Sequence, residues 1–250
     1  SNESGPEAPA DAGVSRSVDR VAGELESRMG RPASELGVQI VETWKDLPNG
    51  RASFIESRSA YDVQGMYDPE TGETYLVAAN IAPGVAFAVF LHELGVHKGM
   101  RALLGEQRMA ALVSQIRAWS KGHGTAEEVR LAKIAAARVP ADTQSATTDE
   151  ELVAYFVEEA VKAGHDIPES RPQRGRLAQW LHDLWQAVRK ALGKLDMAPD
   201  TLTAAEVVAL ARGAAERAAS GSTTKSGDPS ILRSMGPRPR TAESSQQLEE

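Results

Sequence analysis

The sequence predicts an α+β fold that is mostly helical and carries one small β-sheet. Apolar residues at helical spacing open the chain, and short segments rich in β-branched and aromatic residues follow between residues 38 and 79. From Pro83 onward nearly every segment has helical periodicity. Because the strands form one group and do not alternate with helices, we do not expect a βαβ layout.

The chain has 250 residues, 41% of them hydrophobic and 25% charged, with a net charge of −7. This composition excludes a wholly disordered chain. It contains no cysteine, which excludes a disulfide scaffold, a cysteine-ligated zinc finger and a thiol nucleophile. The acidic balance argues against a general DNA-binding protein, so nucleic acid is not an expected partner. No apolar run reaches about 18 residues, so we expect no transmembrane helix.

Composition divides the chain into four segments. Residues 1–13 are small and polar and predict a disordered leader, and residues 221–250 predict a disordered tail. The main domain is expected over residues 14–170, and a C-terminal helical region over 171–220.

A first helix is expected over residues 15–29, where Gly30 and Pro32 end it. Strands are expected at residues 38–42, 52–56, 63–67 and 74–79, and the turn cluster between the last two predicts a hairpin. The expected helices then cover residues 85–105, 106–122, 126–139, a segment capped by Thr148 or Asp149 and ended by Gly164, 175–193 and 203–219.

The most informative segment is FLHELGVHKGM, residues 90–100, which contains His92, Glu93 and His97. The apolar run VAFAVF precedes it, so these ionisable groups are expected at the end of a buried helix. Burying them is costly unless a partner satisfies them, and a zinc ion does so for imidazoles. A neighbouring carboxylate can then take a proton from zinc-activated water. The other interpretation is a satisfied His–Glu cluster in a helical core.

The histidine spacing departs from the H-E-x-x-H motif, in which both histidines share one helical face. His92 and His97 are five positions apart, which places them about 140° apart on an ideal α-helix. A π-bulge would realign the two rings. Alternatively, the helix ends near Gly95 and His97 folds back from an irregular turn.

A catalytic zinc site needs a third protein ligand, and Glu151 is the best candidate. It lies on a later helix, and Ala154, one turn on, allows a close approach between helices. Glu150, Glu158 and Glu159 are alternatives on the same helix, and a solvated acidic face is the ordinary interpretation of any one of them. His165 is the first candidate for a fourth ligand in a purely structural site.

Three segments resemble one family: GMYDPETGETYLVAANI, AVFLHELGVHKGMRALLG and EELVAYFVEEAVKAG. Together they are similar to the zincin-like metallopeptidase domain of phage and prophage polyvalent proteins, of the Mu-like head-protein type. The resemblance covers roughly residues 36–165 and extends more loosely into the helices that follow. It implies that the H-E-x-x-x-H spacing is a family feature.

The resemblance implies a zincin-like fold, in which a small twisted sheet lies over the metal-bearing helix and its edge strand pairs with an extended substrate. His92, His97 and Glu151 would bind Zn²⁺, and Glu93 would be the general base. Tyr155, one turn after Glu151, is a candidate oxyanion donor, although a core aromatic is the commoner role.

The leading hypothesis is therefore zinc-dependent hydrolysis of a protein or peptide substrate, in a cytoplasmic or virion-associated setting. The alternative is a non-catalytic structural or interaction module of a phage polyvalent protein. The basic, amphipathic stretch 171–194 raises a third possibility, a surface that binds nucleic acid or a membrane. Packing of that stretch against the 203–219 helix is the interpretation we favour.

Overall fold

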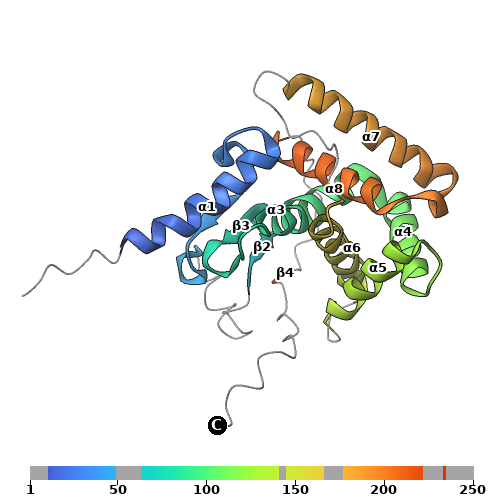
Figure 1. The fold of residues 1–250 in the computed structure, drawn as a ribbon, viewed down its shortest axis with the longest axis horizontal. Coiled ribbons are helices and arrows are strands. Elements are labelled where there is room, and N and C mark those ends of the chain that lie inside the picture. Colours follow the sequence, from blue (N-terminus) through green and yellow to red (C-terminus); the bar gives the residue numbers. More distant parts are fainter. Residues whose placement is uncertain (1–10, 49–62, 141–144, 166–176, 222–232, 235–250) are drawn as a thin grey trace, which may run out of the picture.

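The structure is a computed structural model, and it describes residues 11–48, 63–140, 145–165, 177–221 and 233–234. It confirms the α+β class, because a small sheet accompanies a largely helical body (Figure 1). The expected strand at 52–56, residues 1–10 of the expected leader and most of the expected tail lie outside the described residues.

The sheet has the strand order β1-β3-β2-β4. Strand β1 pairs parallel with β3, whereas β2 pairs antiparallel with both β3 and β4. The predicted hairpin is confirmed, because Asp68 of β2 faces Glu73 of β3 across a turn in which Gly72 has a φ of 72°. The strands cover Gln39–Val41 (β1), Gly65–Asp68 (β2), Glu73–Val77 (β3) and Arg233–Ser234 (β4).

The first helix, α1 (Asp11–Met29), begins before the predicted residue 15 and ends as predicted. Its Val21, Leu25 and Met29 side chains are buried, in keeping with their helical spacing. Glu24 accepts hydrogen bonds from the backbone amides of Gly84 and Ala86. This carboxylate therefore ties α1 to the start of the helical run that carries the histidines.

The predicted helical stretch after Pro83 runs from Ala86 to Ser120, with a break at Gly105, where a φ of 71° and a ψ of 172° are not helical and where the predicted segments 85–105 and 106–122 meet. It consists of α3 (Ala86–Phe90), a π-helix η5 (Leu91–Met100) and α4 (Arg101–Ser120). The break at Gly105 kinks α4 near its start.

The remaining helices lie at the predicted segments, but one begins earlier than predicted and another ends at Met197 instead of at residue 193. They are α5 (Ala126–Arg138), α6 (Ser145–Lys162), α7 (Leu177–Met197) and α8 (Ala204–Ala219). Thr125 and Thr203 cap α5 and α8 through reciprocal bonds with a glutamate three residues on. Thr148 and Asp149 do not cap α6, because the helix already begins at Ser145.

Helix α8 packs along η5, and α7 lies outside it (Figure 1). The favoured packing of the basic stretch is thus confirmed: α7 contacts α8, and its Leu184 and Val188 are buried. None of the described helices combines the length and the apolar character needed to cross a membrane.

Candidate metal centre

The π-helix brings the two predicted histidines together. In a π-helix the backbone bond runs from residue i to i+5, so residues five apart lie on the same side. The ring centroids of His92 and His97 are 4.9 Å apart, with the planes inclined at 65°. The structure thus adopts the first of the two predicted geometries, extended from a bulge to a ten-residue segment.

Two glycines place η5 against α8 at backbone distance. A Cβ atom added at Gly95 would lie 2.8 Å from the carbonyl oxygen of Ala211, and one at Gly99 would lie 2.6 Å from that of Ala214. These separations are shorter than any normal contact, so only glycine fits at both positions. Gly95 thus supports the histidine pair from the side, and it does not end the helix.

Glu151 reaches the histidine pair from α6. Its Oε2 atom lies 3.6 Å from His92 Nε2, and its Oε1 atom lies 3.5 Å from His97 Nε2. One ligand atom from each of the three residues lies within 4.8 Å of the others, and all three residues are buried. The structure therefore brings together the three residues that were predicted to bind the metal.

The separations of the Glu151 oxygens from the two histidine Nε2 atoms suit a zinc ion. Zinc–nitrogen and zinc–oxygen bonds of 2.0–2.2 Å in a tetrahedral site place neighbouring ligand atoms about 3.4 Å apart. The two measured separations from Glu151, 3.5 and 3.6 Å, are close to that value. These separations are also those of ion pairs between a carboxylate and charged histidines, so the geometry fits either a metal or a proton-rich cluster.

Glu150 and Glu158, the alternative ligands on α6, face the other nitrogen of each histidine. Glu158 Oε2 lies 3.4 Å from His92 Nδ1, and Glu150 Oε2 lies 3.6 Å from His97 Nδ1. The remaining alternative, Glu159, pairs with Arg138 and Lys162. Among the three alternatives, none shares the space between the two Nε2 atoms as Glu151 does.

Glu93, the predicted general base, is buried beside this group. Neither of its carboxylate oxygens makes a hydrogen bond of normal geometry. Its Cγ atom would lie 2.7 Å from a Cβ atom added at Gly65, so β2 passes directly over it. Burial raises the pKa of Glu93 to about 8, and positively charged His92 and the Tyr67 backbone amide offset only part of that rise.

His92 and the glutamates around it shift one another's pKa values. Burial would lower the pKa of His92, but Glu151, Glu158 and Glu93 outweigh it and raise the pKa to about 10. Burial would likewise raise the pKa values of Glu151 and Glu158, and the positive charges around them lower both. Without a metal, the cluster therefore holds a proton on His92.

Several buried polar atoms of the cluster make no hydrogen bond of normal geometry. They include His92 Nδ1, Glu151 Oε2, Glu158 Oε2 and both carboxylate oxygens of Glu93. Buried polar atoms are nearly always satisfied in native proteins, and leaving them unsatisfied costs about 1–3 kcal/mol each. A cation among His92, His97 and Glu151 would supply the missing interaction of Glu151 Oε2, so these residues fit a bound metal, whereas His92 Nδ1 and Glu158 Oε2 face each other at 3.4 Å outside that position.

Tyr155, the candidate oxyanion donor, packs between charged groups. Its ring centroid is 5.0 Å from that of His92, and the Arg138 guanidinium lies 4.3 Å from the same centroid. Packing thus accounts for the buried ring, and donation to an oxyanion stays a prediction.

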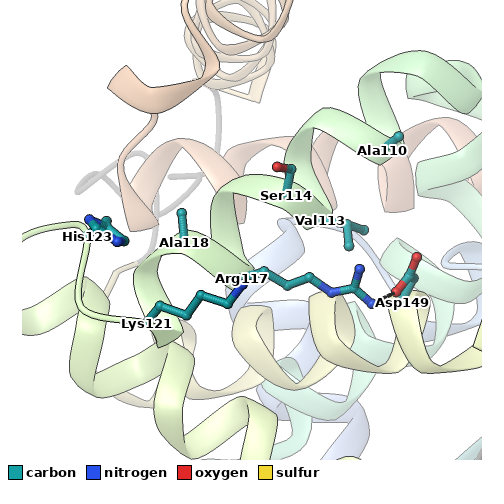
Figure 2. A pocket seen from close by; sticks show the side chains of 8 residues that line it. All are labelled: Ala110, Val113, Ser114, Arg117, Ala118, Lys121, His123 and Asp149. Carbon is teal, nitrogen blue, oxygen red and sulfur yellow. Dashed lines mark hydrogen bonds and ion pairs between the residues drawn. The ribbon is translucent and has the colours of Figure 1, made fainter.

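The other histidines lie elsewhere. His165 Nε2 is 3.6 Å from Glu127 of α5, so it does not join the group as a fourth ligand. His182 Nε2 is 3.3 Å from Gln186 on α7. Figure 2 shows His123 at one end of a surface hollow along α4, in which Arg117 extends toward Asp149. The residues that line this hollow include none of the three predicted ligands, and they do not include Glu93.

Sequence reasoning missed two features of the site. The seven-residue spacing of Glu151 and Glu158 signals that both lie on one face of α6, and it could have placed Glu158 beside His92. The contact between Gly65 and Glu93 has no such signal, because it depends on how β2 crosses η5.

Comparison of the chain with protein-family models, with curated proteins and with solved structures found no match.

Proposed function

We propose that this protein is a zinc-dependent peptide hydrolase with a zincin-like architecture. The observation that carries the proposal is the buried convergence of His92, His97 and Glu151 beside Glu93. Two imidazoles and one carboxylate make a ligand set that leaves the fourth zinc position open for water, as catalytic sites require.

Glu93 acts as the general base and acid. Zinc, when bound, lowers the pKa of its water to about 7 and polarises the substrate carbonyl. The Glu93 carboxylate accepts the proton from that water and passes it to the leaving amine. Burial raises the pKa of Glu93 in the metal-free protein, and a bound cation beside it would lower that pKa and favour the carboxylate that accepts the proton.

Strand β2 is the proposed docking edge for an extended substrate. It is antiparallel to β3, and its Gly65 lies against Glu93. In the structure the two-residue strand β4 occupies the outer side of β2, where Tyr67 faces Arg233 and Met66 faces Ser234, so a substrate strand would dock by taking the place of β4. Main-chain pairing on this edge would hold a peptide next to the general base whatever its side chains.

The arrangement also supports the resemblance to zincin-like domains of phage polyvalent proteins. In both, a small sheet precedes and lies against the helix with the H-E-x-x-x-H spacing. By analogy we propose that the substrate is a protein in a phage or mobile-element context, in the cytoplasm or the virion.

A non-catalytic module is the second candidate, and one observation favours it. All four side chains of the centre are buried, with exposed fractions of 7% or less. In that function the ion, or the proton on His92, would only hold η5 and α6 together.

The test measures zinc content and peptide cleavage together. We expect the wild-type chain to bind about one zinc and to hydrolyse a mixed peptide library. Glu93→Gln should keep the zinc and lose hydrolysis. Glu151→Gln should bind zinc much more weakly, while Asp149→Asn, two positions earlier and paired with Arg117, should match the wild type.

The outcomes separate the candidates. Zinc binding without hydrolysis by the wild type would favour the structural module. Hydrolysis that survives in Glu93→Gln would rule out the general base. A wild-type chain that binds no zinc at all would remove the proposed function.

A further inference from the structure

We propose that Glu158 and Glu150 are positioning residues that hold the two histidines with their Nε2 atoms toward Glu151. This role rests on the proposed metal centre and concerns residues outside its ligand set. The three carboxylates that contact the histidines, those of Glu150, Glu151 and Glu158, all belong to one helix, α6.

Each histidine lies between two carboxylates. The Nε2 atoms of both rings face Glu151, at 3.6 Å for His92 and 3.5 Å for His97. The Nδ1 atoms face away from it, toward Glu158 at 3.4 Å and Glu150 at 3.6 Å. The same atom of each ring thus faces the shared ligand, and a separate carboxylate faces the opposite atom.

Cations fix both outer carboxylates in the same way. The Oε1 atom of Glu150 accepts hydrogen bonds from Arg101 Nε and Nη2, at 3.0 and 2.7 Å. The Oε1 atom of Glu158 accepts from Arg138 Nη1 and Lys162 Nζ, at 2.8 and 2.5 Å. In both cases Oε1 is bound to a cation, and Oε2 is left to face the histidine.

The burial of Glu158 calls for such a role. Its side chain has no exposed surface, burying a carboxylate costs several kcal/mol unless it is paired, and Arg138 and Lys162 pair its Oε1 atom only. Its Oε2 atom nevertheless has no hydrogen bond in the absence of metal. A neutral His92 with its proton on Nδ1 would donate to this atom, and the fold would then satisfy both groups.

The physical consequence is a fixed tautomer. A metal-binding imidazole must be neutral, and a carboxylate at Nδ1 keeps the proton there and leaves the Nε2 lone pair free. It also makes Nε2 more basic and prevents rotation of the ring. Loss of such a partner typically weakens metal binding by about 10- to 100-fold.

The experiment measures zinc affinity of the full chain by competition with a chromophoric chelator. The variants are Glu158→Met, which removes the acceptor, and Glu158→Gln, whose amide oxygen still accepts a hydrogen bond. The matched control is Glu159→Gln, because Glu159 also pairs with Arg138 and Lys162 but has no contact with either histidine ring among the described interactions. Affinities are taken at several pH values, so that easier loss of the His92 proton is separated from ring orientation.

We expect affinity near that of the wild type for Glu159→Gln, a loss of a few fold for Glu158→Gln and a loss of about 10- to 100-fold for Glu158→Met. The Co²⁺ absorption spectrum should change only in the Glu158 variants. Glu150→Met, compared with Asp149→Asn, tests the second histidine in the same way.

Equal zinc affinities for Glu158→Met and Glu159→Gln, with zinc still bound by the wild type, would overturn the positioning role and leave the proposed function standing. Failure of the wild type to bind zinc would overturn both. Circular dichroism and chemical denaturation of each metal-free variant confirm that it is folded before affinities are compared.

Discussion

Gly65 and Glu93 lie in contact across the sheet–helix interface. A Cβ atom at position 65 would lie 2.7 Å from Glu93 Cγ and 3.1 Å from its Oε1 atom. The backbone of β2 therefore forms one wall of the space that the Glu93 carboxylate occupies. This contact links the sheet to the group that moves the proton in the proposed reaction.

Gly65→Ala should displace the Glu93 side chain. We expect a loss of about 1–3 kcal/mol in the free energy of unfolding, as for other overpacked cores. Peptide hydrolysis should fall by more than zinc affinity, because the clash falls on the base and not on a ligand. Chemical denaturation, chelator competition and a peptide assay measure the three quantities.

The control for this substitution is Gly193→Ala in α7, where an added Cβ meets no atom within 4 Å. It should stabilise the protein by up to about 1 kcal/mol, through helix propensity. Full hydrolysis by Gly65→Ala would show that the strand does not constrain Glu93.

The metal-free protein should lose stability as the pH rises from about 6.5 to 8. The folded pKa of Glu93, about 8, exceeds its ordinary value of 4.5, so the unfolded chain loses this proton first and stability falls between those values. His92 has a folded pKa of about 10 against 6.5, so its stabilisation is complete below 6.5 and is lost toward 10. Between about pH 6.5 and 8 the stabilisation from both groups falls as the pH rises.

Glu93→Gln should reduce the slope of unfolding free energy against pH in that window by about 1.4 kcal/mol per pH unit, the share of one proton. Saturating zinc should reverse the trend in the wild type, because its ligands must be deprotonated. Chemical denaturation at a series of pH values measures both effects. Identical slopes for wild type and variant would contradict a raised Glu93 pKa.

Gly99→Ala should loosen the packing of η5 on α8. An added Cβ would lie 2.6 Å from Ala214 O, a backbone atom that cannot move alone. We expect a loss of at least about 1–3 kcal/mol in unfolding free energy and weaker zinc binding. Gly23→Ala in α1, where an added Cβ meets nothing within 4 Å, is the control and should be neutral or stabilising. Unchanged zinc affinity in Gly99→Ala would show that α8 does not support the histidine pair.

Much of the fold follows from local signals in the sequence. Helical spacing of Val21, Leu25 and Met29 predicted α1, and the turn before Glu73 predicted the β2–β3 hairpin. Glycines with positive φ, such as Gly30 and Gly164, follow the helices that they were predicted to end. The start of α6 was missed because Thr148 and Asp149 are good caps, and yet they lie inside the helix.

The convergence of His92, His97 and Glu151 could be predicted from the residue types and the family resemblance, and their binding of a metal stays a prediction. The choice between a π-helix and a broken helix could not be predicted, because it depends on α8 packing against Gly95 and Gly99. The pairing of Glu150 with Arg101 and of Glu158 with Arg138 was also beyond the sequence, because it depends on where the neighbouring helices place these cations. Tertiary packing decided each of these points.

The packing of α8 on η5 determines where this chain can be truncated. Every proposed ligand precedes residue 170, the expected domain boundary, whereas Ala211 and Ala214 come after it. A fragment that ends near residue 170 would lack α8 and would expose one side of the π-helix η5 to water. Long π-helices are rare. Such a fragment would therefore keep the H-E-x-x-x-H motif and yet lose the π-helix that holds the rings of His92 and His97 together.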